Sequence, residues 1–569
     1  MMKPGIGARR LAAGVIASMC MALASATNDA DAPSDTSAAD DAETLRDPSA
    51  SDDFLARNGH HPFDLPATTA CLNALLATGR AQNSHSAIAV AVVLDGRVVY
   101  RRGFGTISPT SAQAVRPTTR FRVGSVTKVM TAMAVLSLAE EGRIPLRAPV
   151  ARLLPNVLLP GEPGWMEQLT ARRLLSNQGG IADPSDAMGP SDDGALAAAF
   201  YDPAFTSTIP LLVAPGTFYN YSSTNFMLAG LLAETAAGKP YRLVVRQRVF
   251  KPLDMDRATF LSSDVTSDTD AASGVGVDRV WAPGEYDDSV ERPAGMAWGS
   301  IDDLAKLAKF ILRGDRKVLA PRSWRALQTP QVDMVQPSAA RQSYGYGLVI
   351  EEGAGFPDST GVQRLYPVRS VWHDGAVPGY RSLSFMLPQQ QFGFVALVNG
   401  DVESEFTDPV PCMRVAAAEA ISPRLPAPIP FPTPQIERDR FVDYIGDYED
   451  RYLAGRALLF LGPAGGLRIQ LPDLDAVGYL YDPLLHPVNR DNFVLNTQDG
   501  ALLLTGFREG GSSVAYLRTR VTVFARSSGA AGVSVQRAAV PVRDTAALKR
   551  AIQAAGRECD TLLPEYLWK

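Results

Sequence analysis

Hydrophobic and polar residues follow clear strand and helix patterns from about residue 62. Residues 86–105, SAIAVAVVLDGRVVYRRGFG, hold two β-rich runs on either side of Asp95-Gly96. Because this dipeptide accepts the positive φ of a tight turn, the segment is predicted to form a β-hairpin. Residues 121–142, FRVGSVTKVMTAMAVLSLAEEG, are apolar on nearly every side. That pattern predicts a buried helix that Gly142 ends.

The same patterns continue to residue 421. Residues 300–314, SIDDLAKLAKFILRG, are predicted to form a helix, as are residues 411–422, PCMRVAAAEAIS. The strand patterns are YGYGLVI, SLSFMLP and QFGFVALVN, over residues 344–350, 382–388 and 391–399. Strands therefore come from both ends of the region and helices from its middle. We expect an α+β domain over residues 62–421, in which helices flank an antiparallel sheet.

A second, smaller domain is predicted to follow a linker. Residues 422–435, SPRLPAPIPFPTPQ, contain six prolines and should be stiff and extended. The short strand patterns beyond it are ALLFLG, GLRIQL, NFVLN, ALLLTGF and VAYLRTRVTVFA, with a hairpin signal at residues 498–500. Residues 436–569 are therefore expected to form a small β-rich domain of barrel type, with a helix over residues 544–556.

The N-terminus has the features of an export signal. Basic residues within the first ten positions precede an apolar run that ends at Ala24, and small residues follow. We predict a signal peptide over residues 1–26, export to the periplasm or the extracellular space, and no membrane span after cleavage. Residues 27–61 are predicted to be a disordered acidic spacer, because they are rich in Asp and lack apolar periodicity.

Export makes disulfides possible in the mature chain. Cleavage of the signal would leave Cys71, Cys412 and Cys559, an odd number that permits at most one internal bridge. Cys71 and Cys412 start two predicted helices near the two ends of the main domain. The sequence leaves two alternatives, a Cys71–Cys412 bridge or three buried free thiols.

Charge and composition exclude several classes of function. The net charge is −5 and no strongly basic segment is present, which argues against nucleic acid as a partner. The five histidines are scattered, and no phosphate-binding loop or dinucleotide motif is found, so we expect no metal and no cofactor. A small molecule or a peptide remains as the expected substrate, and the sequence does not set the oligomeric state.

Ser125 and Lys128 stand near the start of the predicted helix 121–142. Three residues apart, they share a helix face with Cβ atoms about 5–6 Å apart. Burial favours a neutral amine over an ammonium, and a neutral amine beside a hydroxyl can take its proton and release a nucleophilic alkoxide. The helix N-terminus adds N–H groups near the developing oxyanion. The pair is therefore predicted to be a nucleophile with its base, and a lysine that extends to solvent is the alternative. No G-x-S-x-G motif surrounds Ser125, which argues against an α/β-hydrolase.

An ordered set of segments carries a resemblance to a known family. The segments are AVAVVLDGRVVYRRGFG, FRVGSVTK, LLSNQGGI, APGTFYNYSSTNFMLAGLL, PAGMAWGSIDDLAKLAKFI, YGYGLV and HDGAVPGYRS. Over residues 62–422 the chain resembles the serine β-lactamase-like hydrolases of the class C type, which include DD-peptidases, D-aminopeptidases and carboxylesterases. The resemblance implies a β-lactamase/penicillin-binding-protein-like fold. FVDYIGDYED, residues 441–450, resembles the opening of lipocalin-like β domains that some members append.

The resemblance implies a role for each matching residue. Ser125 would be the nucleophile, Lys128 its base, and Tyr221 the residue that carries protons to and from the leaving group. In the strand motif HDGA, His373 would orient the substrate and support proton transfer. Gly375 would lie beside the substrate, and the backbone N–H of Ala376, with that of Ser125, would bind the oxyanion.

Two positions depart from the family pattern. Ser223 stands where the family usually has an asparagine that binds an amide carbonyl of the substrate. Serine can still form a hydrogen bond but is shorter, which disfavours amide-bearing substrates and favours esters. Residues 174–181, LLSNQGGI, lack the usual histidine and serine, so this segment is expected to be structural.

The sequence thus predicts an exported serine hydrolase that forms an acyl-enzyme. Esters are the first expected substrate, peptides or amides of D-amino acids the second, and β-lactams the third. The alternative is a penicillin-binding-like protein with little turnover that binds or regulates, which the replacement of asparagine by Ser223 would permit.

Overall fold

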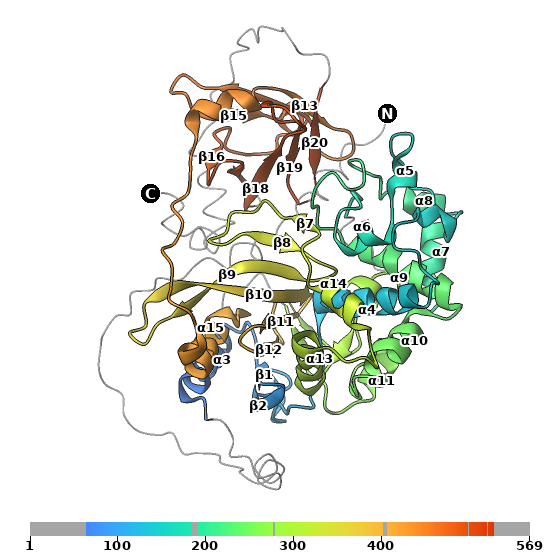
Figure 1. The fold of residues 1–569 in the computed structure, drawn as a ribbon, viewed down its shortest axis with the longest axis vertical. Coiled ribbons are helices and arrows are strands. Elements are labelled where there is room, and N and C mark those ends of the chain that lie inside the picture. The colour runs from blue at the N-terminus through green and yellow to red at the C-terminus, as the bar shows by residue number, and fades with distance from the viewer. Residues whose placement is uncertain are drawn as a thin grey trace.

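The structure is a computed structural model that describes residues 64–183, 191–276, 279–401, 407–498, 500–520 and 522–527. Within these ranges the chain forms an α+β domain, an extended linker and a β-barrel domain (Figure 1). The predicted signal peptide, the acidic spacer, the helix over residues 544–556 and Cys559 lie outside the described residues.

The larger domain is built on an eight-stranded sheet with the order β2-β1-β12-β11-β10-β9-β8-β7. The strands are β1 (Ala87–Leu94), β2 (Arg97–Gly105), β7 (Val332–Asp333), β8 (Gln342–Tyr344), β9 (Val349–Pro357), β10 (Gln363–Val377), β11 (Tyr380–Leu387) and β12 (Phe392–Val398). β1 pairs antiparallel with β12, with Ile88 opposite Val398. The sheet therefore joins both ends of the domain, which confirms the predicted α+β class.

Helices cover both faces of this sheet. α13 (Ile301–Arg313) packs on β1, β11 and β12, and Ser300 and Asp303 form a capping box at its start. The opposite face is covered by α3 (Pro66–Ala81) and α15 (Val410–Ile421), which pack on each other. Each face has its own apolar core, since alternate residues of the buried strand β1 point to opposite sides.

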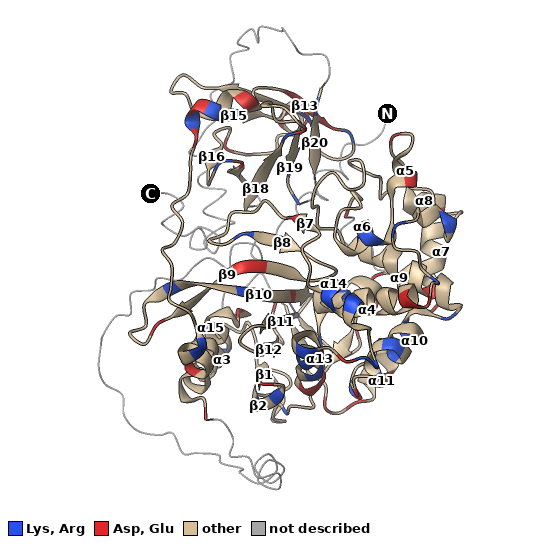
Figure 2. Cartoon of the chain, in the orientation of Figure 1, with Lys and Arg blue, Asp and Glu red and all other residues tan. Residues whose placement is uncertain are grey.

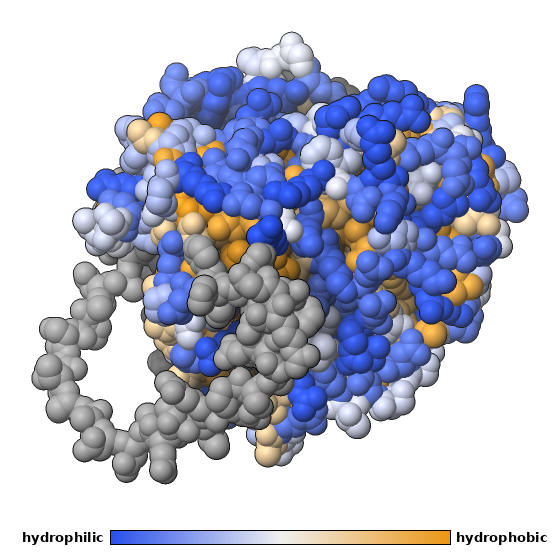
Figure 3. Space-filling view, turned by 60° about the horizontal axis from the view of Figure 1, so that its bottom comes forward, coloured by the Kyte–Doolittle hydropathy of each residue, from blue (hydrophilic) through white to orange (hydrophobic). Residues whose placement is uncertain are grey.

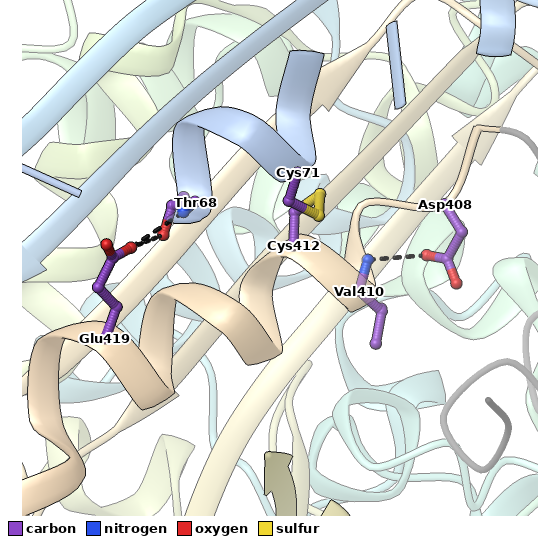
Figure 4. The surroundings of a disulfide bond; sticks show 6 residues. All are labelled: Thr68, Cys71, Asp408, Val410, Cys412 and Glu419. Carbon is purple, nitrogen blue, oxygen red and sulfur yellow. Dashed lines mark hydrogen bonds between the residues drawn. A yellow bond between two sulfur atoms is a disulfide. The ribbon is translucent and has the colours of Figure 1, made fainter. Parts of the chain in front are cut away.

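A disulfide joins α3 to α15. Cys71 and Cys412 are bonded, which settles the alternatives left by the sequence (Figure 4). Beside this bond, the Glu419 carboxylate accepts hydrogen bonds from the backbone N of Ala67 and of Thr68, both at 2.9 Å. A carboxylate at the N-terminus of α3 favours that helix, so covalent and electrostatic contacts together hold this layer.

The remaining helices form a cluster at one side of the sheet. They are α4 (Thr127–Glu140), α5 (Trp165–Gln168), α6 (Ala171–Leu175), α7 (Ala195–Tyr201), α8 (Pro203–Thr206), α9 (Ser223–Ala237), α10 (Tyr241–Val245), α11 (Ser262–Thr266), α12 (Arg292–Gly295) and α14 (Pro321–Leu327). Short strands pair as β3 (Phe121–Arg122) with β6 (Trp298–Gly299) and as β4 (Gly274–Val275) with β5 (Val280–Trp281). The apolar helices α4 and α9 pack against each other at the centre of this cluster.

Two sequence predictions for this domain need correction. The helix expected over residues 121–142 begins only at Thr127, because Phe121 and Arg122 pair with β6 and Gly124 has φ of +51°. Residues 344–350 do not form one strand. β8 ends at Tyr344 and β9 begins at Val349, and between them Gly347 turns the chain with φ of +74°.

The C-terminal domain is an eight-stranded antiparallel sheet with the order β15-β14-β13-β20-β19-β18-β17-β16. Its elements are β13 (Gly446–Asp450), β14 (Gly455–Leu461), β15 (Leu467–Gln470), α16 (Pro472–Ala476), β16 (His486–Pro487), β17 (Asn492–Thr497), β18 (Gly500–Phe507), β19 (Tyr516–Arg518) and β20 (Val523–Arg526). Residues 483–485 link β15 to β16, since Ile469 N donates to Pro483 O at 2.8 Å and Leu485 N to Leu467 O at 3.0 Å. The sheet is thus a nearly closed barrel, as predicted.

The barrel domain docks beside β7, β8 and the helical cluster (Figure 1). The ring of Phe218 stacks on that of Phe507 with centroids 4.3 Å apart, and the buried Val213 and Val523 join the same apolar cluster. A second link between the domains is the exposed ion pair of Arg451 with Glu162. Apolar stacking and an ion pair therefore fix one domain against the other.

Basic and acidic residues are interspersed over both domains (Figure 2), in line with the small net charge of −5. On the face shown in Figure 3, hydrophilic residues predominate and apolar residues lie in bands between them. Across the described ranges of the chain, no helix is long and apolar enough to cross a membrane.

Candidate active site

Ser125 and Lys128 meet at the N-terminal end of α4. Ser125 lies on a 3₁₀ turn, Gly124–Val126, that leads directly into the helix, and Lys128 lies in the helix's first turn. Lys128 Nζ is 2.9 Å from Ser125 Oγ. Lys128 is fully buried, whereas Ser125 is partly exposed. The predicted pair is therefore in contact, with the hydroxyl on the side that faces solvent.

Two further oxygens hold the Lys128 amine. Its Nζ donates to the backbone O of Ala294 at 2.8 Å and lies 3.4 Å from Ser223 Oγ. Ala294 belongs to α12, which is held on α4 because Thr131 Oγ1 donates to Pro293 O at 2.6 Å. With Ser125, these atoms give the amine three oxygen neighbours. A buried amine needs such partners, and they fix Nζ beside the serine.

Tyr221 completes a triangle with these two residues. Its Oη donates to Ser125 Oγ at 2.9 Å, and Lys128 Nζ lies 5.0 Å from the centre of its ring. The phenol therefore contacts the hydroxyl from a second side, where it can exchange a proton with it or with a group that leaves it.

The loop that carries Tyr221 is held by the segment 174–181. Asn177 O accepts from Asn220 N at 2.8 Å, and Asn177 Oδ1 accepts from Ser222 N at 3.2 Å and from Asn225 Nδ2 at 3.1 Å. These bonds lie on both sides of Tyr221. The segment thus supports the site through its backbone and one amide, which matches the structural role expected for it.

The strand motif of β10 packs against the turn that bears the serine. A Cβ atom on Gly375 would lie 2.9 Å from Ser125 N and 2.2 Å from Val123 O. A Cβ atom on Gly124 would lie 2.6 Å from Ala376 N. The backbone N–H groups of Ser125 and Ala376 are therefore close neighbours, and both glycines are needed for this approach. Two such donors beside a nucleophile are the elements of an oxyanion hole.

His373 lies on the same strand, β10, and is buried. Its Nε2 is 3.1 Å from Tyr344 Oη, its Nδ1 contacts the backbone O of Asp374 at 2.5 Å, and its side chain is 3% exposed. Burial, and then the nearby Lys128 charge, lower the pKa of His373 to about 3. The imidazole is therefore neutral at ordinary pH, and its contacts hold Tyr344 and the strand in place. Its expected role towards the substrate stays a prediction.

The structure adds residues that the sequence analysis did not single out. Tyr344 contacts His373, and Asp183 Oδ1 accepts from Ser223 N at 2.8 Å. From the barrel domain, the Arg520 guanidinium lies 4.9 Å from the centre of the Tyr221 ring. No local motif marks these positions, because each depends on packing between segments far apart in the chain. Among the residues described, no group of three His, Cys, Asp or Glu side chains could hold a metal ion.

Comparison with known proteins gives a matching family model and similar relatives. The family model named Beta-lactamase matches residues 72–411. Protein flp of Staphylococcus aureus (strain MW2) is 27% identical over 315 residues, which cover 54% of this chain and 59% of that protein. Unguisins hydrolase ungD' of Aspergillus campestris (strain IBT 28561) is 28% identical over 330 residues, which cover 55% of this chain and 58% of that protein. The chain therefore spans less than two thirds of the length of either relative.

Solved structures share the fold over most of the chain. The octameric penicillin-binding protein homologue from Pyrococcus abyssi has a TM-score of 0.53 at 20% identity and covers 81% of this chain and 100% of its own. SurE with D-Leu has a TM-score of 0.57 at 21% identity and covers 81% of this chain and 99% of its own. At such identities the likeness concerns the fold alone. Because the family model matches more than half of the residues, the chain belongs to the beta-lactamase family.

Proposed function

We propose that this protein is a serine hydrolase that cleaves esters or amides through an acyl-enzyme on Ser125. The observation that carries the proposal is the contact of Ser125 Oγ with both Lys128 Nζ and Tyr221 Oη, each at 2.9 Å. A hydroxyl between an amine and a phenol can lose its proton as it attacks. Membership of the beta-lactamase family and a relative named a hydrolase support the same reading.

The reaction has two steps. Ser125 Oγ attacks the carbonyl carbon while Lys128 or Tyr221 takes its proton, and the negative charge on the carbonyl oxygen faces the N–H groups of Ser125 and Ala376. The bond to the leaving group then breaks, and Tyr221 delivers a proton to the departing oxygen or nitrogen. Water next attacks the acyl group by the reverse path and frees Ser125. General acid–base catalysis of this kind contributes roughly 10²–10⁴-fold to a rate, and loss of an oxyanion donor costs about 10²–10³-fold.

Esters remain our first substrate class. The Ser223 hydroxyl lies 3.4 Å from Lys128 Nζ and its backbone N is bonded to Asp183, so the residue faces the lysine. A short side chain so placed is poorly suited to hold an amide carbonyl of a substrate. Amides of D-amino acids rank second, supported by the name of a SurE structure with D-Leu, and β-lactams rank third.

We also propose that the protein is exported. The Cys71–Cys412 disulfide supports this, because such bonds persist mainly in oxidising compartments. Purification of the protein from the producing cell and N-terminal sequencing test the proposal. A mature chain that begins at about residue 27 is expected, and an intact N-terminus on the intracellular protein would refute export.

The test of the hydrolase uses p-nitrophenyl butyrate with the wild type and with Ser125→Ala. Hydrolysis by the wild type and its loss in the variant, with an unchanged circular-dichroism melt, are expected. A variant that keeps most of the activity would refute the assignment of Ser125. A fluorophosphonate probe separates the binding-protein alternative, since a live nucleophile is labelled and an inactive one is not.

A further inference from the structure

The barrel domain extends a hairpin tip to the active site. β19 and β20 are joined by a turn in which Thr519 N donates to Thr522 O at 2.9 Å, and the two threonine hydroxyls are 2.7 Å apart. Arg520 lies in this turn, between the two threonines. The closed turn limits the freedom of the tip, so it presents Arg520 in a defined place.

The hairpin is anchored on the larger domain at the strand pair next to its tip, Arg518 and Val523. Arg518, at the end of β19, is buried; it donates to the backbone O of Tyr219 and lies 3.4 Å from that of Met334. Tyr219 is two residues before Tyr221. Burial lowers the pKa of Arg518 to about 10, which leaves it charged at neutral pH. The hairpin is therefore held against the same loop that carries Tyr221.

Arg520 itself lies beside the catalytic groups. Its guanidinium carbon is 4.9 Å from the centre of the Tyr221 ring, and its Nη2 is 3.8 Å from Asp183 Oδ2. Burial raises the pKa of Asp374, next to His373, and the Arg381 and Arg520 charges lower it, so the Arg520 charge also acts on β10. One arginine of the barrel domain thus lies beside Tyr221 and Asp183, on the loop side of the site.

Within the described residues, the Arg520 guanidinium keeps free hydrogen-bonding capacity. Among the residues that the structure describes, its ion-pair partner is Asp183, at a distance beyond that of a hydrogen bond. Its side chain is 33% exposed. A guanidinium carries five N–H donors in a planar fork that matches a carboxylate. It is therefore available to an anionic group that arrives from solvent.

We propose that Arg520 binds a carboxylate on the leaving group of the substrate. This inference rests on the proposed hydrolase function and names its substrate class, esters or amides that release a hydroxy acid or an amino acid. We assign the carboxylate to the leaving group because Arg520 lies over the ring of Tyr221, and Tyr221 delivers the proton to the departing atom. The barrel domain is then part of the substrate site, and Arg520 determines specificity.

A matched pair of esters tests the inference on the full-length protein. The esters are 3-carboxyphenyl butyrate and 3-carbamoylphenyl butyrate, which share the acyl group and differ in the charge of the leaving group. The wild type is expected to prefer the carboxylate ester by roughly 10–100-fold in kcat/KM, the size of a charge-assisted hydrogen-bonded pair. Arg520→Ala is expected to abolish this preference, and Arg520→Lys to keep part of it, because lysine retains the charge without the fork.

The control variant is Arg451→Ala. Arg451 also joins the two domains by an ion pair, with Glu162, but contacts none of the catalytic residues, so this variant should keep the preference of the wild type. Hydrolysis of both esters without a preference, or with a preference that Arg520→Ala leaves unchanged, would overturn the role of Arg520 and leave the hydrolase in place. Failure of the wild type to hydrolyse either ester or to form an acyl-enzyme would overturn the proposed function and this inference with it.

Discussion

Replacement of Lys128 by alanine removes one group from the centre of the site. Lys128 Nζ contacts Ser125 Oγ, Ser223 Oγ and the backbone O of Ala294, and the residue is fully buried. The variant leaves Ser125 in contact with Tyr221, so the serine remains but loses one of its two proton acceptors.

The expected size of the effect follows from these contacts. Loss of a general base costs roughly 10²–10⁴-fold in rate, and we expect kcat/KM of Lys128→Ala to fall by that factor. For stability, the Ala294 carbonyl loses its hydrogen-bond donor, which costs about 1–3 kcal/mol. Burial of the amine itself costs free energy, and the variant no longer has this cost, which offsets part of the loss. Because the free energy of unfolding is typically about 5–15 kcal/mol, the variant should still fold.

The assay compares hydrolysis of p-nitrophenyl butyrate by the wild type, Lys128→Ala and Lys128→Met, with thermal melts of each. Methionine fills the volume of the lysine stem, so it separates loss of the amine from loss of packing. Lys309→Ala, an exposed position on α13, is the control. A folded Lys128→Met protein within tenfold of the wild type would refute the role of the lysine as base.

Further variants test other parts of the account. Gly375→Ala should lower kcat roughly 10²-fold or more, because its Cβ would lie 2.2 Å from a backbone carbonyl oxygen and displace the oxyanion donors. The control Gly355→Ala, in β9, adds a Cβ that meets no atom within 4 Å and should keep activity. Equal activities of the two variants would contradict the oxyanion geometry. The pKa of His373 is lowered from 6.5 to about 3 in the folded protein. Between these pH values the imidazole is protonated in the unfolded chain and neutral in the folded protein, so the free energy of unfolding falls as pH drops. His373→Gln should therefore flatten the decline of Tm between pH 6.5 and 4, and an unchanged slope would contradict the buried neutral imidazole. Replacement of Cys71 and Cys412 by serine should cost about 2–5 kcal/mol of unfolding free energy, and a Tm equal to that of the oxidised wild type would contradict a stabilising bridge.

Much of the fold was predictable from local sequence patterns. The hairpin of β1 and β2 was predictable because Asp95 and Gly96 supply the positive φ values, 52° and 77°, that its turn requires. The contact between Ser125 and Lys128 was predictable because a spacing of three places both on one side of a helical turn. Both features depend on neighbours in sequence.

Features that depend on distant segments were not predictable in the same way. Residues 514–525, VAYLRTRVTVFA, are apolar enough to suggest one strand, but the structure bends them into β19 and β20 with Arg520 at the turn. Nothing near Arg520 in sequence indicates that it meets Tyr221, about three hundred residues earlier. The start of α4 was misplaced for the same reason, because β6 takes Phe121 and Arg122 into a strand pair.

The disulfide was predictable only in part. The three cysteines expected after cleavage of the predicted signal peptide permit at most one internal bridge, but spacing could not choose between a bridge and free thiols. Packing of α3 on α15 brings Cys71 and Cys412 together, with Glu419 fixing the register of the two helices.

Intact-mass spectrometry after rapid acid quench shows whether Ser125 forms an acyl-enzyme. The protein is mixed with p-nitrophenyl butyrate, or separately with a penicillin, and the adduct is located by peptide mapping. We predict a transient butyryl adduct on Ser125 that is absent from Ser125→Ala, and a weaker or absent adduct from the penicillin. Turnover of the ester without an adduct on Ser125, or an adduct on another residue that Ser125→Ala retains, would contradict this prediction.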